Sequence, residues 1–221
     1  MLGSEEAEVM ARVVAAFAMS LDGFIAGSND GGRRPLGDGG RRLFDWYFDG
    51  DTAIRHYRQA ASRGVPVPPF KLSSSSAEVF EELIENGGAV VTGRRTYDIS
   101  NAWGGNGPLP GLPVFVLTHH VPEHVPPGES RFIFVTDGVD SAIEQAKAAA
   151  GEKYVSLMGA SVAQQCLRAG LLDEIQVHLV PVLLGAGVRL FDHLGPESIE
   201  LETVRVVDSP GVTHLRFRVV K

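Results

Sequence analysis

Residues 90–98 of the chain read VVTGRRTYD. The stretch starts within a short apolar segment, Ala89–Thr92, which is typical of a buried strand. A glycine, two arginines and a threonine follow where a helix is expected to begin. Backbone N–H groups at a helix start, a hydroxyl group and two guanidinium groups can all donate to an anion. The stretch therefore predicts a turn that binds phosphate, and the alternative is that Arg94 and Arg95 are solvated surface charges.

Short apolar segments on both sides of this turn alternate with helical ones. Strands are expected at Arg12–Met19, Val114–Thr118, Phe132–Val135 and Tyr154–Met158, and helices at Ser141–Ala150 and Val162–Ala169. Strands that alternate with helices predict a mostly parallel sheet with helices on both faces. The nearly continuous apolar run at Arg12–Met19 is typical of a central strand, because such a strand is buried on both faces.

The last third of the chain has a different pattern. Polar and apolar residues alternate in Asp173–Leu184, Ile199–Asp208 and Thr213–Val220, and residues 208–211 (DSPG) form a turn between the last two. This pattern predicts an antiparallel edge. The expected fold is an α/β protein with three layers, α/β/α, on a mixed sheet of about eight strands.

The segment between the first strand and Ala89 is less regular. Gly27–Gly40 is rich in glycine and is expected to be a surface loop, and Leu43–Ala61 has the spacing of two short helices. Val65–Ser76 is an extended proline- and serine-rich segment. It ends in a predicted capping box, Ser75 with Glu78, at the start of another helix.

Composition limits the class of protein. The chain has 221 residues, 44% of them hydrophobic, a formal net charge of −7 and one cysteine, Cys166. We expect a single domain over residues 11–221, with residues 1–10 as a flexible extension that lacks the features of a signal peptide. No apolar run approaches the ~20 residues of a membrane span. The negative charge disfavours nucleic acid, and the sparse cysteine content is typical of a cytoplasmic protein.

Several catalytic mechanisms lack their motifs. The sequence has no nucleophile elbow, no Walker loop and no HExxH motif. His119 and His120 are adjacent, so on a strand they point to opposite faces, and no metal site is predicted.

Two further loops resemble the first in position. Residues 158–165 (MGASVAQQ) follow a predicted strand with small residues and open a helix, which suits a pyrophosphate, although close packing of helix and strand is the alternative. Val116–His119 ends another strand with a hydroxyl group and an imidazole. Ligands of open α/β sheets bind where such loops leave the carboxyl ends of the strands.

Taken in order, these segments resemble the dihydrofolate reductase-like superfamily, in particular the branch related to the C-terminal reductase domain of the riboflavin-biosynthesis enzyme RibD. The resemblance covers about Arg12 to Val220. It rests on SLDGFIA (20–26), VVTGRRTYD (90–98), PVFVLTH (113–119), MGASVAQQ (158–165), LLDEIQVHLVPVLLGAGVRLF (171–191) and the final hairpin.

The resemblance implies an NADPH-dependent reductase. It places Ala18 and Ile25 beside the nicotinamide; Gly93, Arg94, Arg95 and Thr96 on the pyrophosphate and the adenosine phosphate; Leu117, Thr118 and His119 beside the adenine ribose; and Met158, Gly159, Ala160, Ser161, Val162 and Ala163 in a second phosphate loop. The two arginines agree with this cofactor, because guanidinium groups favour the 2′-phosphate of NADPH, whereas an NAD site more often offers an acid to the ribose.

The implied substrate is a small conjugated heterocycle, either the 5-amino-6-ribosylaminopyrimidinone phosphate of riboflavin biosynthesis or a pterin. Glu78 and Asp22 are the candidate proton donors; alternatively, Glu78 only completes the capping box and Asp22 only shapes its Asp-Gly turn. Trp46, Tyr47, Phe48 and Trp103 lie in segments that could cover the substrate or belong to the core.

Two departures from the family pattern keep a second function open. Met158 stands where the family often has the first of two glycines, sometimes joined by a cis peptide, and residues 28–76 are an insertion relative to dihydrofolate reductases. The alternative is a non-catalytic protein of the same fold that binds NADPH or a flavin-like ligand. The resemblance also implies a homodimer that pairs through the apolar C-terminal strands.

Overall fold

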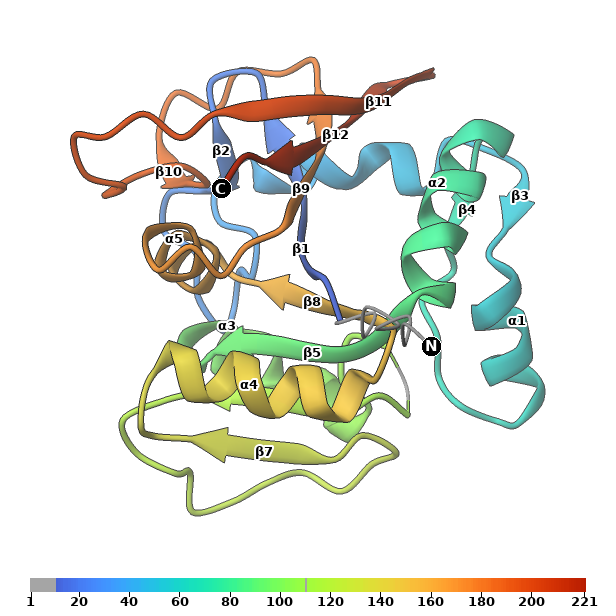
Figure 1. Ribbon diagram of the computed structural model, residues 1–221. Helices are drawn as coiled ribbons and strands as arrows, with labels where there is room; N and C mark the ends of the chain where they lie inside the picture. Colours follow the sequence, from blue (N-terminus) through green and yellow to red (C-terminus); the bar gives the residue numbers. More distant parts are fainter. Residues whose placement is uncertain (1–10, 110) are drawn as a thin grey trace, which may run out of the picture.

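The computed structural model describes residues 11–109 and 111–221. The expected flexible extension, residues 1–10, lies outside the described residues. The centre of the molecule is an eight-stranded sheet in the order β11-β12-β9-β1-β8-β5-β6-β7 (Figure 1). Its strands are β1 (Val13–Ser20), β5 (Gly87–Gly93), β6 (Val114–Leu117), β7 (Phe132–Val135), β8 (Tyr154–Met158), β9 (Glu174–Val180), β11 (Leu201–Ser209) and β12 (Val212–Val219).

The strand directions confirm the predicted mixed sheet. From β9 through β1, β8, β5 and β6 to β7, adjacent strands are parallel to one another, and β12 is antiparallel to both β9 and β11. β1 lies between β8 and β9, as its continuous apolar run predicts. The predicted strand at Asp173–Leu184 is longer than β9, because the chain leaves the sheet after Val180.

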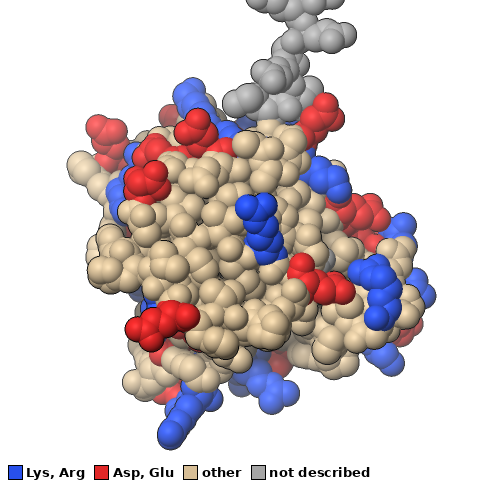
Figure 2. All heavy atoms as spheres, turned by 90° about the horizontal axis from the view of Figure 1, so that it is seen from below, with Lys and Arg blue, Asp and Glu red and all other residues tan. Residues whose placement is uncertain are grey.

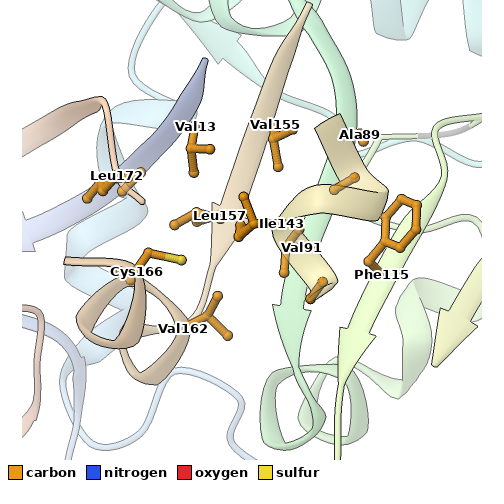
Figure 3. Packing of buried hydrophobic residues seen from close by; sticks show 14 of the residues in the cluster. Val13, Ala89, Val91, Phe115, Ile143, Val155, Leu157, Val162, Cys166 and Leu172 are labelled. Carbon is orange, nitrogen blue, oxygen red and sulfur yellow. The ribbon is translucent and has the colours of Figure 1, made fainter. Parts of the chain in front are cut away.

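One face of the sheet is covered by α4 (Val139–Ala150) and α5 (Ala160–Arg168). Figure 3 shows Ile143 of α4 beside Leu157 of β8, and Val162 of α5 belongs to the same core. Cys166 is buried in this core, and burial raises the pKa of its thiol to about 12. α5 begins two residues before the predicted start, directly after Gly159.

The opposite face is covered by α2 (Ser74–Glu85), α3 (Arg94–Ile99) and two 3-10 helices, η1 (Gly40–Tyr47) and η2 (Asn101–Gly105). Alternation along β5 assigns its residues to the two faces, with Val90 packed on this side and Ala89 and Val91 on the other. The predicted three-layer α/β/α architecture is therefore confirmed.

The insertion, residues 28–76, packs largely as an aromatic cluster. It contains η1, the short strands β3 (Thr52–Ala53) and β4 (Lys71–Leu72), and α1 (Arg55–Ser62). α1 lies beside α2 at one side of the molecule (Figure 1). The Tyr47 ring packs at a tilt against those of Trp46 and Phe70, with ring centroids 4.1 and 4.7 Å apart. The two short helices expected in Leu43–Ala61 are present as η1 and α1.

The start of α2 differs from the predicted one. The N-cap is Ser73, whose hydroxyl accepts from the Ser76 backbone N–H at 3.2 Å, so Ser75 and Glu78 do not form the capping box. Four consecutive serines offer equivalent caps, and the sequence alone could not select among them.

The fold also contains a small antiparallel ribbon that was not predicted from the sequence. β2 (Phe24–Gly27) pairs with β10 (Gly187–Arg189), and this pairing ties the chain after β1 to the chain after β9. Strands of four and three residues are too short for a period of two to be recognised.

Charged side chains of both signs are interspersed on the face drawn in Figure 2. Within residues 11–109 and 111–221, no helix has both the length and the apolar character needed to cross a membrane.

Two buried histidines lie under Trp46. His178 Nδ1 of β9 and His214 Nδ1 of β12 are 2.7 Å apart, and His214 Nε2 is 2.9 Å from the Ser76 hydroxyl. One imidazole must accept from the other, so the two rings cannot both be protonated. Burial, with the neighbouring imidazole as a second cause, lowers the pKa of His178 to about 3, and burial lowers that of His214 to about 4.

Stability is therefore expected to fall in mild acid. Below the unfolded-state pKa of about 6.5, the two histidines become protonated in the unfolded chain but stay neutral in the folded chain down to about pH 4. In this range each histidine lowers the free energy of unfolding by up to about 1.4 kcal/mol per pH unit. His214→Gln should make the dependence of the unfolding midpoint on pH shallower between pH 7 and 4.5. His124→Gln, at an exposed position, should leave it unchanged. Parallel profiles for His214→Gln and the parent chain would contradict this account.

Candidate functional site

A cavity of about 680 Å³ opens where the parallel strands end at their carboxyl termini. Its size is within the range of small-molecule and cofactor sites. The described lining residues are Ile25, Ala26, Asp30, Pro35, Leu36, Gly93, Arg94, Arg95, Thr96, Ile99, Leu117, Thr118, His119, His120, Thr136, Gly138, Met158, Gly159, Ala160, Ser161, Val162, Gln165 and Val188. The three predicted ligand loops thus meet in one place.

The first loop presents the two arginines. β5 ends at Gly93 and α3 begins at Arg94. Arg94 Nε donates to Asp98 Oδ1 at 2.9 Å, one turn along the same helix, and its Nη1 donates to the His120 carbonyl at 2.7 Å. Arg94 therefore connects α3 to the chain after β6.

Arg95 takes a different partner. Its Nη2 donates to Asp30 Oδ1 at 2.7 Å and to the Asp30 carbonyl at 2.9 Å. Asp30 belongs to the glycine-rich segment that precedes η1 and itself lines the cavity. Both arginines are thus at the cavity, and each is paired with a carboxylate.

The second loop touches the first. Gly159 has φ +90°, and a Cβ built on it would lie 2.5 Å from Thr96 Oγ1, so glycine is required both by the backbone and by the neighbour. The Met158–Gly159 peptide is trans. Gly159 is also the N-cap of α5, whose first turn, Ala160–Val162, faces the cavity with N–H groups that have no partner within the helix.

The third loop is shaped by Thr118. Its hydroxyl donates to the His120 carbonyl at 2.9 Å and accepts from the His120 N–H at 3.3 Å. This local turn places Leu117 and His119 beside Arg94, whose guanidinium contacts the same carbonyl.

The cavity also has an apolar wall. Ile25 and Ala26 of β2 and Val188 of β10 form it together with Pro35 and Leu36 of the glycine-rich segment. A flat apolar ring can pack on such a wall, while the arginines and the α5 N-terminus take negative charge. The cavity therefore suits an elongated ligand with an apolar group and phosphates.

Sequence reasoning missed several lining residues. Thr136 and Gly138 follow β7 and could have been found by the rule that located the other strand ends. Asp30, Pro35 and Leu36 carry no local signal, because only the fold brings their segment to the cavity. Ile99, His120, Gln165 and Val188 are also among the residues missed.

Two predicted cofactor residues lie elsewhere. Ala18 is buried against the Trp46 cluster, and Ala163 is buried in the core between α5 and the sheet. Successive side chains on a strand or a helix point in different directions, so residues next to a lining residue can be buried in the core instead. None of Trp46, Tyr47, Phe48 and Trp103 lines the cavity.

The candidate proton donors are outside the cavity lining. Glu78 is exposed on α2. Asp22 accepts from the Ser20 hydroxyl at 2.6 Å and from the backbone N–H groups of Leu184 and Gly185 at 3.1 and 2.7 Å. These hydrogen bonds, that from Ser20 first, lower the pKa of Asp22 to about 2. Asp22 is thus an ionised carboxylate that holds the loop after β1 to the loop after β9.

The donor set at the cavity fits an organic anion. Arg94, Arg95, Thr96, Ser161 and the first turn of α5 all line it. Among the described residues, no group of three or more His, Cys, Asp or Glu side chains could hold a metal ion.

A family model for the RibD C-terminal domain matches residues 11–215. The chain belongs to this family. The matched range includes every described residue that lines the cavity. A search of curated protein sequences returned no significant match.

Solved structures agree with the family. A protein from Shewanella sp. PV-4, described as a riboflavin biosynthesis protein, is 25% identical with a TM-score of 0.64, and the match covers 96% of this chain and all of that one. A riboflavin biosynthesis reductase from Saccharomyces cerevisiae is 11% identical with a TM-score of 0.55, covering 99% and 94%. Dihydrofolate reductase from Enterococcus faecalis, solved with NADP(H), is 16% identical with a TM-score of 0.50, covering 97% and 98%. These likenesses show that the chain has the dihydrofolate reductase-like fold.

The contact between the two phosphate loops can be tested by substitution. Gly159→Ala should destabilise the fold by about 2 kcal/mol or more, because it adds backbone strain to the clash with Thr96 Oγ1. Thr96→Ala in the same chain should restore part of this loss, since the next nearest atom of Thr96 is 3.6 Å away. Gly195→Ala, where φ is also +90° and no atom lies within 4 Å, measures the effect of a positive φ without the clash. Thermal unfolding of the parent chain and the three variants gives the losses, and equal losses for Gly159→Ala and Gly195→Ala would contradict the clash.

Proposed function

We propose that this protein is an NADPH-dependent reductase that transfers hydride to a small conjugated heterocycle. One observation carries the proposal: a single cavity holds two arginines, two touching glycine turns and an apolar wall at the carboxyl ends of parallel strands. Membership of the RibD C-terminal domain family and the likeness to an NADP(H)-bound dihydrofolate reductase support it.

In this proposal the polar end of the cavity binds the phosphates. The first turn of α5, from Ala160, receives the pyrophosphate on its N–H groups, together with Gly93 and Thr96. Arg94 and Arg95 bind the adenosine phosphate and its neighbours, and Leu117–His119 borders the adenine ribose. A dinucleotide with a 2′-phosphate uses both guanidinium groups. NADH has no 2′-phosphate, so it leaves one of the two guanidinium groups without a phosphate partner.

The apolar wall is proposed to hold the nicotinamide. Ile25 and Val188 exclude water from one face of the ring and fix its orientation, which is the main requirement of hydride transfer. NADPH, when bound, supplies the hydride. Neither Glu78 nor Asp22 lines the cavity, so we propose that the substrate takes its proton from solvent.

The proposed substrate is the aminopyrimidinone phosphate of riboflavin biosynthesis or a pterin. The family supports the first, and a bifunctional deaminase/uracil reductase from Thermotoga maritima is a structural neighbour with a TM-score of 0.54 at 16% identity. The match covers 96% of this chain and 57% of that one.

A second candidate function is binding of NADPH or a flavin-like ligand without turnover. The positions of the two acids favour it: Glu78 is exposed outside the cavity, and Asp22 is ionised and holds three hydrogen bonds. Steady oxidation of NADPH with an aminopyrimidinone or a pterin would exclude this candidate. Tight binding with no oxidation by either substrate class would favour it.

Thermal unfolding with each nucleotide tests the cofactor. At 100 times its dissociation constant NADPH should stabilise the chain by about 2.7 kcal/mol, a shift of roughly 5 to 10 °C. Arg94→Ala with Arg95→Ala should abolish most of this shift and change the response to NADH much less. Arg168→Ala, on the surface at the end of α5, should keep the full shift. Equal losses with both nucleotides would refute the role of the arginines at the 2′-phosphate.

We also propose that residues 11–221 form one domain and that the protein is a homodimer. The edge strand β11 exposes Leu201, Val204 and Val206, which are 42, 45 and 58% exposed. An exposed apolar edge strand is a surface for pairing with a second chain. Light scattering should give twice the chain mass of 23.7 kDa, and a value near one chain would overturn this proposal.

A further inference from the structure

The glycine-rich segment beside the cavity is a folded loop. We refer to residues 28–39 as the strap. The Gly27 N–H donates to the Leu36 carbonyl at 2.9 Å, and the Asp38 N–H donates to the Ser28 carbonyl at 2.7 Å. A Cβ on Gly27 would lie 1.8 Å from the Asp38 carbonyl oxygen, so the ends of the strap approach as closely as glycine allows. These contacts close the strap into one compact loop beside β2.

The strap is joined to the cavity through Asp30. The Asp30 side chain is 16% exposed, although the side chain of its partner Arg95 is 64% exposed. Arg95 Nη2 holds both the carboxylate and the backbone carbonyl of residue 30. One guanidinium group therefore fixes the side chain and the main chain of the strap.

Arg94 provides the internal comparison. Its carboxylate partner, Asp98, is on the same helix, has a half-exposed side chain and does not line the cavity. The partner of Arg95 lines the cavity and belongs to a segment distant in sequence. The carboxylate that pairs with Arg95 is thus part of the cavity lining, whereas the carboxylate that pairs with Arg94 is outside it.

We propose that the Asp30 carboxylate stands in the place of a ligand phosphate on Arg95 Nη2, so that a phosphate that takes this nitrogen displaces Asp30 and releases the strap. This inference rests on the anion-binding role proposed for the cavity. A phosphate group has more charge and more acceptor oxygens than a carboxylate, so it can bind the Arg95 guanidinium more strongly than Asp30 does. Arg95 Nη2 carries both hydrogen bonds to Asp30, so a phosphate that takes this nitrogen replaces them.

The exchange makes Asp30 an internal competitor of the ligand phosphate. A ligand without a phosphate at this position leaves the Asp30–Arg95 pair in place. Asp30 thereby lowers the affinity for ligands that place a phosphate on Arg95 and narrows their preference over unphosphorylated ones.

Calorimetric titration of the whole chain with NADPH tests the exchange. Asp30→Asn removes the charge at constant size, and it should lower the dissociation constant for NADPH about fivefold. Asp30→Glu keeps a competing carboxylate and should stay within about twofold of the parent chain. An unchanged or weaker affinity in Asp30→Asn would overturn the proposal.

Asp137→Asn is the matched control. Asp137 is exposed between the lining residues Thr136 and Gly138, so the substitution removes one negative charge beside the cavity without touching Arg95. It should leave the affinity for NADPH unchanged. A gain equal to that of Asp30→Asn would mean that net charge alone is responsible and would overturn the displacement of Asp30.

Inorganic pyrophosphate separates this inference from the proposed cofactor. If the parent chain does not bind NADPH, the proposed function fails, and the inference is decided by pyrophosphate alone. Tighter binding of pyrophosphate by Asp30→Asn than by the parent chain would support the displacement. Equal binding, or binding by neither chain, would overturn it.

Discussion

The parallel pairing of β5 with β8 is the constraint on which the cavity depends. In this register Thr92 lies opposite Met158, so both strands end together and deliver Gly93 and Gly159 to the same edge. The side chain of Thr96 then fills the space that a Cβ on Gly159 would need. A shift of one residue between these strands would separate the two turns and bury or expose the wrong side chains. Burial of both faces of β5 and β8, between α4 and α5 on one side and α3 on the other, holds the register in place.

Much of this arrangement was predictable from the sequence, because it follows from strong periodic signals. Buried parallel strands are short apolar runs, and Phe132–Val135 and Tyr154–Met158 were predicted with the bounds that the structure has. Strand ends in a parallel sheet converge, so the loops at Gly93, Leu117 and Met158 were expected to meet, and they do. The final hairpin was predicted by its turn residues, and Gly211 adopts φ +74° there.

The remainder depended on contacts between distant segments. Nothing near Asp30 in the sequence indicates that it lies against Arg95, because the two are brought together by the strap and α3. Ala18 was expected at the cofactor from resemblance alone, whereas the aromatic insertion covers it in this chain. The cap of α2 was misplaced because hydroxyls at four successive positions are equivalent until the tertiary fold positions one of them.

The burial of Cys166 has a practical consequence. Thiol-reactive dyes and spin labels attack the thiolate, and a fully buried thiol with a raised pKa presents almost none at neutral pH. It is also the one cysteine in the sequence. Cys166 therefore does not need to be removed before labelling. A probe attached to a thiol introduced on the surface of the strap would report the position of the strap without a contribution from labelled Cys166.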